Sequence, residues 1–549
     1  MKILPEPEMI KIGKKHYSFD GFSNLPVFLK KEFGIRDGKW KIEKIKKAGN
    51  GLKITDGKVQ TWGDDFTSYA TLIQIVRQSK NMLPEIEIEE SFKFKFRGYH
   101  LDIARGGVPN LDTFKSLLRW LFLAKYNYFA IYFEDLFPWK IDPEIGKHRG
   151  RLTEDEVKEI IDYGRSLGIE VFPSLELTGH MEHILSLPKY REFSEWHRPS
   201  EGCLDLSNKA ASDFAIKLLE EVVEFFPSKY IHIGGDETWA LGRGKSLNKN
   251  WEFQGHKLYE SHYDRMIKVV KSHDKMPMMW GDMLTGMYLS KAESQKWQEV
   301  LKSRIWDEAI IANWDYSPDK KSFFKSKINS FGERKTSQIA CPGLSDWNTF
   351  YPDFKTAITN VKNFIDAARD ENLPGFMVTS WGDDGQECLF SFLNPLILAT
   401  MEIAEGNGRW EEKWMALTGE DEKITNVRKI FGNSQISTIT LKRVLFGELY
   451  PLYKIKDEDR KIKDEFEMVL DQTKDIILPD DLEFLKQMIE TAIAVMNNKA
   501  RTSDFIFLSN IYSKLWLRER KSEGLEYLLP RFWGMAGMID MKNDYLSGK

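Results

Sequence analysis

Residues 231–239 read IHIGGDETW, and this short stretch decides how the rest of the chain is interpreted. Its apolar start is typical of the end of a buried strand. Two glycines then allow unusual backbone angles, and two adjacent acids, Asp236 and Glu237, follow them. Two carboxylates at the point where a buried strand runs out indicate chemistry rather than packing.

A rhythm of strand, loop and helix repeats on both sides of this stretch. Eight segments are predicted as strands: 94–104, 126–134, 169–177, 229–237, 277–283, 310–316, 338–344 and 375–383. Helical patterns lie between most of them, at 111–126, 153–168, 211–226 and 353–370, and Thr153 with Glu156 forms a capping-box pattern. Eight strands followed by helices predict an α/β fold, a (β/α)8 TIM barrel. A doubly wound open sheet is the alternative, but RGGVPN at 105–110 does not match its phosphate loop.

The segments that flank the barrel differ from it in pattern. Residues 1–90 contain short alternating strands with DG and NG turns and one helical stretch at 66–80, which predicts a non-catalytic α+β domain. Residues 91–405 form the predicted catalytic barrel. Residues 406–549 are predicted to be a helical C-terminal domain, and its helical stretches are 436–453, 464–474, 481–522 and 528–542.

Composition and charge exclude several classes of function. A net charge of −4 over 549 residues gives no global field that would recruit nucleic acid or an anionic membrane. Three distant cysteines imply no disulfide framework, no apolar run approaches a membrane span of roughly 20 residues, and the N-terminus shows no secretion signal. We therefore expect a cytoplasmic protein. Its 17 tryptophans are unusual, and some are expected to line a sugar site.

The predicted strand ends carry acids and indoles. In such a barrel the active site lies at the carboxyl ends of the strands. These ends hold Asp102 and Arg105, Glu134 and Asp135, Glu176 and His180, Asp236, Glu237 and Trp239, Trp280 and Asp282, Trp314, Asp315 and Tyr316, Asp346 and Trp347, and Trp381, Asp383 and Asp384. Carboxylates take hydroxyl hydrogen bonds and indoles cover ring faces, so the pattern predicts a site for a neutral sugar.

The adjacent acids suit glycoside cleavage. Two neighbouring carboxyl groups raise each other's pKa, so one stays protonated while the other ionises. An acid for the leaving oxygen and an anion beside the developing positive centre are what the reaction needs. The alternative is that Asp236 or Thr238 merely caps a helix, although ALGRGKS after them is a poor helix.

A metal site is the other alternative for these strand ends. His180, Glu176, Asp135 and Asp236 offer nitrogen and oxygen ligands. Only one strand-end histidine is well placed, however, and no HxH or HExxH pattern occurs. We expect no metal and no cofactor.

The stretch resembles the signature of glycoside hydrolase family 20, the β-N-acetylhexosaminidases, in which a strand ends in H-x-G-G-D-E. His232, Gly234, Gly235, Asp236 and Glu237 match it residue by residue. Other segments agree in order: FRGYHLDIAR (96–105), FEDLFPW (133–139), FPSLELTGH (172–180), MWGDM (279–283) and SWGDDG (380–385). The resemblance covers about residues 1–400, the α+β domain included. It implies an exo-acting hydrolase that releases terminal β-linked GlcNAc or GalNAc from glycans.

The resemblance also implies a mechanism. The substrate's 2-acetamido oxygen attacks the anomeric carbon and forms an oxazolinium intermediate, so no protein nucleophile is used. Glu237 would be the general acid and then the general base, and Asp236 would hold the acetamido N–H. The residues implied to contact substrate are Arg97, which would grip the sugar hydroxyls, Asp135, His180, Trp280, Trp314, Tyr316, Trp347, Trp381 and Asp383, with Glu176 behind the acids as a partner of His180. A purely structural His180 is the alternative.

The sequence departs from the family in two places, which suggests a divergent subgroup. The seventh strand end reads CPGLSDWN and lacks the usual tyrosine that donates to the acetamido oxygen, so Tyr316 is the candidate replacement. The second strand ends in IYFED rather than a histidine-rich run.

Two other functions stay open. One is a retaining glycosidase with a protein nucleophile, Asp383 or Asp315, about 5 Å across the sugar from Glu237. The other is a non-catalytic sugar-binding barrel, which would predict the loss of one acid. The C-terminal helices are expected to pack on the barrel or to form a homodimer interface.

Overall fold

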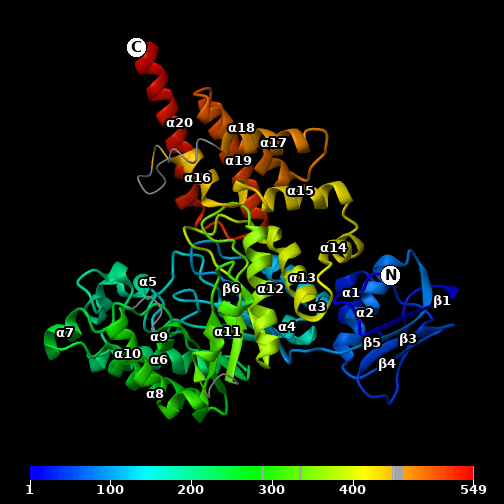
Figure 1. The fold of residues 1–549 in the computed structure, drawn as a ribbon, viewed down its shortest axis with the longest axis horizontal. Helices are drawn as coiled ribbons and strands as arrows, with labels where there is room; N and C mark the ends of the chain where they lie inside the picture. The colour runs from blue at the N-terminus through cyan, green and yellow to red at the C-terminus, as the bar shows by residue number, and fades with distance from the viewer. Residues whose placement is uncertain (286–289, 333–336, 448, 450–461, 548–549) are drawn as a thin grey trace.

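Eight parallel strands close into a barrel in the middle of the chain (Figure 1). The strands are β6 (Phe96–Asp102), β7 (Tyr128–Tyr132), β8 (Glu170–Ser174), β9 (Tyr230–His232), β10 (Met276–Trp280), β11 (Ile310–Trp314), β12 (Gln338–Cys341) and β13 (Gly375–Ser380). They pair in chain order, and β13 pairs with β6 to close the ring. Every predicted strand is present, so the predicted barrel is confirmed and the open sheet is wrong. The computed structural model describes residues 1–285, 290–332, 337–447, 449 and 462–547.

Helices surround the barrel. They are α3 (Leu111–Leu123), α4 (Glu154–Ser166), α5 (Glu182–Leu185), α6 (Lys209–Phe225), α7 (Lys245–Asn250), α8 (Gly255–Ser272), α9 (Asp282–Thr285), α10 (Lys291–Leu301), α11 (Lys321–Asn329), α12 (Phe354–Asp370) and α13 (Asn394–Glu405). The four predicted helices correspond to α3, α4, α6 and α12, and Thr153 and Glu156 form the predicted capping box. Helix α8 escaped prediction because its buried face uses histidine and tyrosine as well as aliphatic residues.

Bulky side chains fill the barrel interior. Near the amino ends of the strands Phe96 stacks on Tyr128, with ring centroids 4.1 Å apart, and Tyr230 lies 5.5 Å from Phe96. Nearer the carboxyl ends, Trp280 lies 5.9 Å from Trp381. Because the interior is packed, a ligand site can form only above these layers, at the carboxyl ends of the strands.

The N-terminal domain lies beside the barrel and contains a five-stranded mixed sheet (Figure 1). Its elements are β1 (Met9–Ser18), α1 (Val27–Phe33), β2 (Lys41–Lys44), β3 (Asn50–Thr55), β4 (Lys58–Trp62), α2 (Asp65–Gln78) and β5 (Met82–Glu90), and the strand order is β1-β5-β3-β4-β2. Gln74 on α2 donates to the carbonyl of Leu123 at the end of α3, which joins the two domains.

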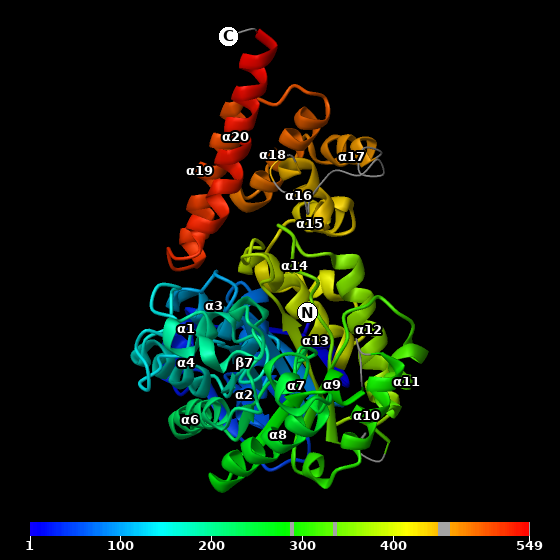
Figure 2. The same ribbon diagram turned by 90° about the vertical axis from the view of Figure 1, so that its left-hand side faces the viewer.

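Helices continue to the C-terminus and stand at one end of the barrel (Figure 2). They are α14 (Trp410–Thr418), α15 (Glu422–Gly432), α16 (Ile439–Phe446), α17 (Lys463–Thr473), α18 (Asp480–Met496), α19 (Thr502–Glu519) and α20 (Leu525–Ser547). The predicted stretch 481–522 is two helices with a break after Met496. Of the predicted helix 436–453, residues 448 and 450–453 lie outside the described residues.

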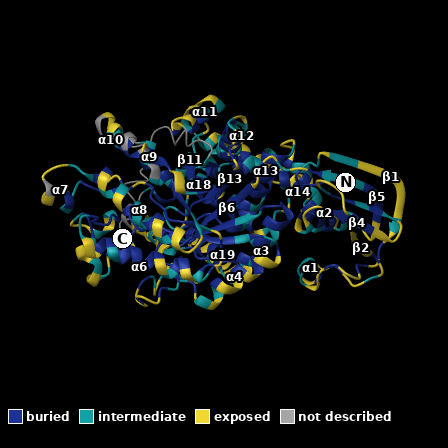
Figure 3. Cartoon of the chain, turned by 90° about the horizontal axis from the view of Figure 1, so that it is seen from below, coloured by how far each residue is buried: buried dark blue, intermediate teal, exposed yellow. Residues whose placement is uncertain are grey.

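Burial follows this arrangement. Buried residues concentrate in the barrel and along its contacts with the helices, whereas exposed residues lie on the outer helices and turns (Figure 3). Among the helices that the structure describes, none combines the length and the apolar character needed to cross a bilayer. The boundaries at residues 90 and 405 stay predictions.

Candidate active site

The turn after β9 carries the adjacent acids Asp236 and Glu237. Gly234 and Gly235 have φ angles of +72° and +104°, which favour glycine. A Cβ atom on Gly234 would lie 2.3 Å from Oε1 of Glu176, and one on Gly235 would lie 2.5 Å from Oη of Tyr259. Nδ1 of His232 accepts a hydrogen bond from the Gly234 N–H at 3.1 Å. The glycines are therefore required both by the backbone conformation and by close packing.

A cavity of about 220 Å³ opens above this turn. Its lining residues are Arg105, His180, Asp236, Glu237, Trp314, Tyr316, Trp347, Trp381 and Asp383. All nine were identified at predicted strand ends, and all but Arg105 were expected to contact substrate or to catalyse; the structure brings them together in one place. Their roles in binding and catalysis stay predictions.

Three expected substrate contacts lie elsewhere. Arg97 sits near the amino end of β6, where its guanidinium donates to the carbonyls of Lys125 and Phe94 at 3.0 and 2.8 Å. The active-site end of the barrel is the opposite one, so the expected grip of Arg97 on the sugar is wrong. Arg105, after the same strand, lines the cavity instead.

Asp135 and Trp280 also differ from expectation. Asp135 is buried and its Oδ1 lies 3.0 Å from a guanidinium nitrogen of Arg149, outside the cavity lining. Trp280 is fully buried inside the barrel, 4.3 Å from the ring of His232 and beneath Trp381. It supports the cavity floor rather than lining it.

Arg105 stands among three acids. Its nitrogens lie 3.1 Å from Oε1 of Glu134, 3.4 Å from Oδ2 of Asp102 and 3.7 Å from Oδ1 of Asp383. Burial raises the pKa of Glu134 to about 8, although the charge of Arg105 opposes this. Asp383 is the most exposed of the three acids, so it is the one able to meet a ligand.

His180 bridges the acid pair. Its Nε2 lies 3.6 Å from Oδ2 of Asp236 and 3.7 Å from Oε2 of Glu237. Burial acts to lower the pKa of His180, but the charge of Asp236 outweighs it and raises this pKa to about 9. Burial would raise the pKa of Asp236, yet His180 and a hydrogen bond with Glu176 hold it well below the usual range. Near neutral pH, Asp236 is thus an anion facing a cation.

Glu176 and Glu237 are shifted toward their protonated forms. Burial, followed by the charge of Asp236, raises the pKa of both side chains. Glu176 is buried, and its Oε2 accepts a hydrogen bond from the Gly235 N–H at 3.1 Å; its expected pairing with His180 stays a prediction. Glu237 is the more exposed of the two acids and reaches the cavity. One anion beside one solvent-facing acid is a division suited to acid catalysis.

Asp282 is a site residue that the sequence did not select. One of its carboxylate oxygens accepts from the Glu237 N–H at 2.9 Å, and the other accepts from the indole of Trp314 at 3.1 Å. Asp282 therefore links the backbone of Glu237 to the side chain of Trp314. The sequence signal was its place two residues after Trp280, at a strand end.

Aromatic rings form the opposite wall. Trp314 stacks on Tyr316 with centroids 5.0 Å apart, and Trp347 lies 5.0 Å from Tyr316 on its other side. The hydroxyl of Tyr316 accepts from the indole N–H of Trp381 at 2.7 Å. Burial raises the pKa of Tyr316 well above its usual value, so the hydroxyl keeps its proton.

Strained backbone marks the same strand ends. Glu134, His180 and Glu237 have φ angles of +44°, +48° and +48°, which non-glycine residues rarely adopt. Each costs of order 1–3 kcal/mol and persists only where the surroundings hold it. Strain at three neighbouring strand ends is typical of a functional site.

Comparison with protein families agrees with this geometry. The family model described as "Glycosyl hydrolase family 20, catalytic domain" matches residues 94–402, more than half of the chain. The chain belongs to glycosyl hydrolase family 20.

Two relatives are similar over part of their length. A β-hexosaminidase of Vibrio furnissii is 29% identical over 268 residues, which are 40% of this chain and 43% of that protein. Hexosaminidase D of Homo sapiens is 25% identical over 304 residues, which are 53% of this chain and 61% of that protein. The matched segments thus span less than two thirds of either relative.

Solved family 20 structures share the fold. The β-N-acetylhexosaminidase from Bacteroides fragilis superposes with a TM-score of 0.58 at 20% identity, covering 74% of this chain and 91% of that one. A chitobiase from Flavobacterium johnsoniae gives a TM-score of 0.58 at 16% identity and covers 97% and 99%. This second likeness extends through the C-terminal helices.

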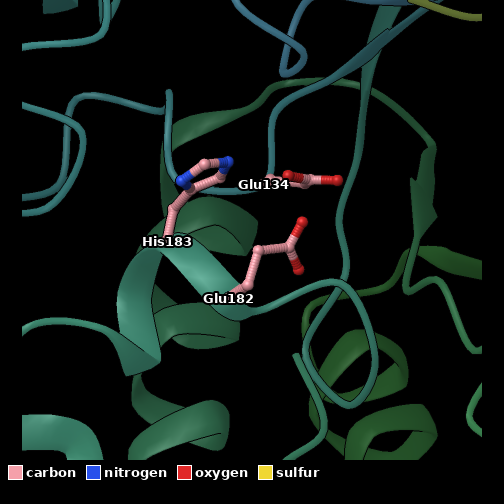
Figure 4. A group of neighbouring side chains, drawn as sticks. All are labelled: Glu134, Glu182 and His183. Atoms are coloured by element: carbon pink, nitrogen blue, oxygen red, sulfur yellow. The ribbon is translucent and has the colours of Figure 1, made fainter. Parts of the chain in front are cut away.

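One cluster beside the family 20 site has the composition of a metal site. Ligand atoms of Glu134, Glu182 and His183 lie within 4.8 Å of one another (Figure 4). However, Glu134 already pairs with Arg105, and burial together with the charge of Arg149 lowers the pKa of His183 to about 4. A cation there would meet two guanidinium groups, so the cluster fits the ion-pair network around Arg105 better than a metal centre.

Proposed function

We propose that this protein is an exo-acting β-N-acetylhexosaminidase that hydrolyses terminal β-linked GlcNAc or GalNAc by substrate-assisted, retaining catalysis. The observation that carries the proposal is that Asp236 and Glu237 line one cavity, 3.6 and 3.7 Å from the same His180 nitrogen, with the pKa of Asp236 lowered and that of Glu237 raised. Family 20 membership supports it.

In the first step the 2-acetamido oxygen attacks the anomeric carbon while the bond to the leaving oxygen breaks. Glu237 gives its proton to that oxygen. Positive charge develops on the acetamido group, and the anionic Asp236 accepts the N–H and offsets the charge. We propose that Tyr316, which keeps its proton, donates to the acetamido oxygen.

In the second step water opens the oxazolinium ring. Glu237, now a carboxylate, takes a proton from the water as it attacks the anomeric carbon, and the acetamido group leaves. Two displacements at one carbon retain its configuration. Trp314, Trp347 and Trp381 supply apolar faces for the sugar, and Arg105 with Asp383 offers hydrogen bonds to its hydroxyls.

The size of the cavity supports action at a chain end. At about 220 Å³ it is smaller than the roughly 300 Å³ at which pockets for drug-sized ligands begin. It suits one terminal sugar rather than an internal segment of a glycan.

The described residues also weigh against a protein nucleophile. Asp315 is bound to Ser317 and to Lys327 and does not line the cavity. Asp383 is the one remaining lining carboxylate among the described residues, and its nearest charged partner is Arg105.

The test compares an aryl β-N-acetylglucosaminide with the matching aryl β-glucoside, using wild type, Asp236→Asn and Asp383→Asn. We expect cleavage of the acetamido substrate alone, with a loss of about 10²- to 10³-fold in kcat for Asp236→Asn. Equal cleavage of the glucoside would show that the acetamido group takes no part. A covalent intermediate that is lost in Asp383→Asn would establish a protein nucleophile.

A second substrate tests exo action. A chitotriose labelled at its reducing end should release single unlabelled sugars from the other end. Early release of a labelled monosaccharide would contradict cleavage from the non-reducing terminus.

A further inference from the structure

We infer that the C-terminal helices position one wall of the cavity, with Lys442 on α16 and Arg531 on α20 as the positioning residues. They act on the loop that follows β13, which carries Trp381 and Asp383 into the cavity. The inference deepens the proposed function and uses its assay, but the structural part stands on contacts alone.

Four charged groups form a network at this loop. Nζ of Lys442 lies 2.5 Å from Oδ2 of Asp384 and 2.5 Å from Oε2 of Glu387. A guanidinium nitrogen of Arg531 lies 2.8 Å from Oδ1 of Asp384 and donates to its carbonyl at 3.1 Å. The other terminal nitrogen of Arg531 contacts Glu387. Each base thus meets both acids, and the two acids belong to the loop.

Three of the four side chains in the network are shielded from solvent, and Asp384 is the most exposed member. The side chains of Lys442 and Glu387 are fully buried, and that of Arg531 is 11% exposed. Buried charges add stability only when every partner is present, and the loss of one leaves an uncompensated charge. A network of this kind therefore acts mainly by fixing one arrangement of the loop.

Residues of α19, and Arg520 directly after it, bind the loop backbone from Glu387 to Phe390. The hydroxyl of Tyr512 donates to the carbonyl of Glu387 at 2.9 Å. Glu519 accepts the N–H of Phe390 at 2.8 Å, and Arg520 donates to the carbonyl of Cys388. The loop is thus held from three C-terminal helices.

The barrel holds the start of the same loop. The N–H of Gly382 donates to Oδ2 of Asp102 at 2.9 Å, and Trp381 donates to Tyr316. Asp383, between these anchors and Asp384, faces Arg105. A shift of Asp384 consequently moves Asp383 and the indole beside it, which would disturb the position of the sugar.

The variants are Arg531→Met, Lys442→Met and Asp384→Asn, and the last is nearly isosteric and lies on the exposed side of the network. Arg531→Lys keeps the charge but loses the fork of the guanidinium. Arg518→Met is the matched control, because Arg518 pairs with Asp480 between α18 and α19, and among the described residues its side chain forms no hydrogen bond or ion pair with the loop.

Kinetics are measured well below each melting temperature. We expect the first three variants to lose roughly 10- to 100-fold in kcat/KM, since a misplacement of about 1 Å can cost 10²-fold. KM should rise as well as kcat fall, Arg531→Lys should recover part of the loss, and Arg518→Met should match wild type.

Hydrogen exchange of residues 381–390 gives a readout that needs no activity. Exchange in this segment should speed up in the three variants and stay unchanged in Arg518→Met. If Asp384→Asn and Arg531→Lys melt at lower temperature yet keep wild-type kcat, KM and loop exchange, the helices are merely structural and the inference is wrong. A wild type that cleaves no hexosaminide would instead refute the proposed function, and the exchange experiment would still decide this inference.

Discussion

Nε2 of His180 lies 3.6 Å from Oδ2 of Asp236, and neither side chain is more than one-fifth exposed. The two residues come from different strand ends, β8 and β9, so the barrel itself sets their separation. A cation at this place keeps Asp236 ionised even though burial favours its neutral form. The same ring nitrogen lies 3.7 Å from Glu237, which couples the anion to the acid.

The first prediction concerns the charge on His180. Its pKa is raised to about 9 by Asp236 against the effect of burial. In Asp236→Asn the largest influence that raises this pKa is lost, while burial and the charge of Arg105 still lower it, so the pKa of His180 should fall below its ordinary value of about 6.5. Imidazole titration by NMR measures this, with His180→Asn to assign the signal. An unchanged pKa in Asp236→Asn would contradict the pairing.

The second prediction is the pH dependence of stability. Because the pKa of His180 is higher in the folded protein than in the unfolded chain, its contribution is fully present below about pH 6.5. It is then lost as pH rises through about 9. Urea unfolding at pH 6 and pH 9.5 should show a loss on the order of 1–3 kcal/mol that His180→Asn lacks. If the free energy of unfolding falls equally in both proteins between pH 6 and pH 9.5, His180 is not the group that titrates.

The third prediction separates the two steps that use Glu237. Glu237→Gln cannot protonate the leaving oxygen, so kcat for a natural glycan should fall by roughly 10²- to 10⁴-fold. An aryl glycoside whose phenol is already a good leaving group needs less protonation, so its first step should be slowed far less. Single-turnover release of phenol measures that step. A loss that is the same for all leaving groups would contradict the general-acid role.

The fold and most of the cavity could be predicted because each strand has a recognisable local sequence pattern. Apolar runs predicted the eight strand positions, and all nine lining residues follow the carboxyl ends of these runs, although only eight of them were given a role. The prediction for Arg97 was wrong because the resemblance was assigned to the arginine inside β6 rather than to Arg105, which follows the strand. The polarity of the strand alone indicates Arg105, since only that residue follows the carboxyl end.

Other features depend on geometry that the sequence does not record. Glu134 and Asp135 are neighbours, yet Glu134 pairs with the cavity residue Arg105 and Asp135 pairs with Arg149. The contacts of Lys442 and Arg531 with the loop after β13 join positions 55 to 147 residues apart. No local pattern marks such pairs.

The fourth prediction tests the tie made by Asp282, both of whose oxygens accept hydrogen bonds from donors. In Asp282→Asn the amide nitrogen would face a donor, either the Glu237 N–H or the indole of Trp314. The mismatch should reduce the free energy of unfolding by about 1–3 kcal/mol and displace Glu237 enough to lower kcat. Asp319→Asn, on the exposed surface of the same barrel, is the control. Wild-type kcat in Asp282→Asn would show that the tie does not hold the acid in place.

The fifth prediction concerns the requirement for glycine at position 234, in the turn after β9. Gly234 has a φ of +72°, and a Cβ there would lie 2.4 Å from the carbonyl oxygen of Leu175 as well as close to Glu176. Gly419, which ends α14, has a nearly equal φ of +74° with nothing within 4 Å of its Cβ position. Gly419→Ala should therefore cost only the left-handed conformation, about 1–2 kcal/mol, whereas Gly234→Ala adds a clash of roughly 1–3 kcal/mol. Urea unfolding compares the two, and kcat should fall only in Gly234→Ala because its turn carries Asp236 and Glu237. Equal losses of stability with unchanged activity would mean that the turn relaxes around the methyl group, and that the two acids do not depend on its shape.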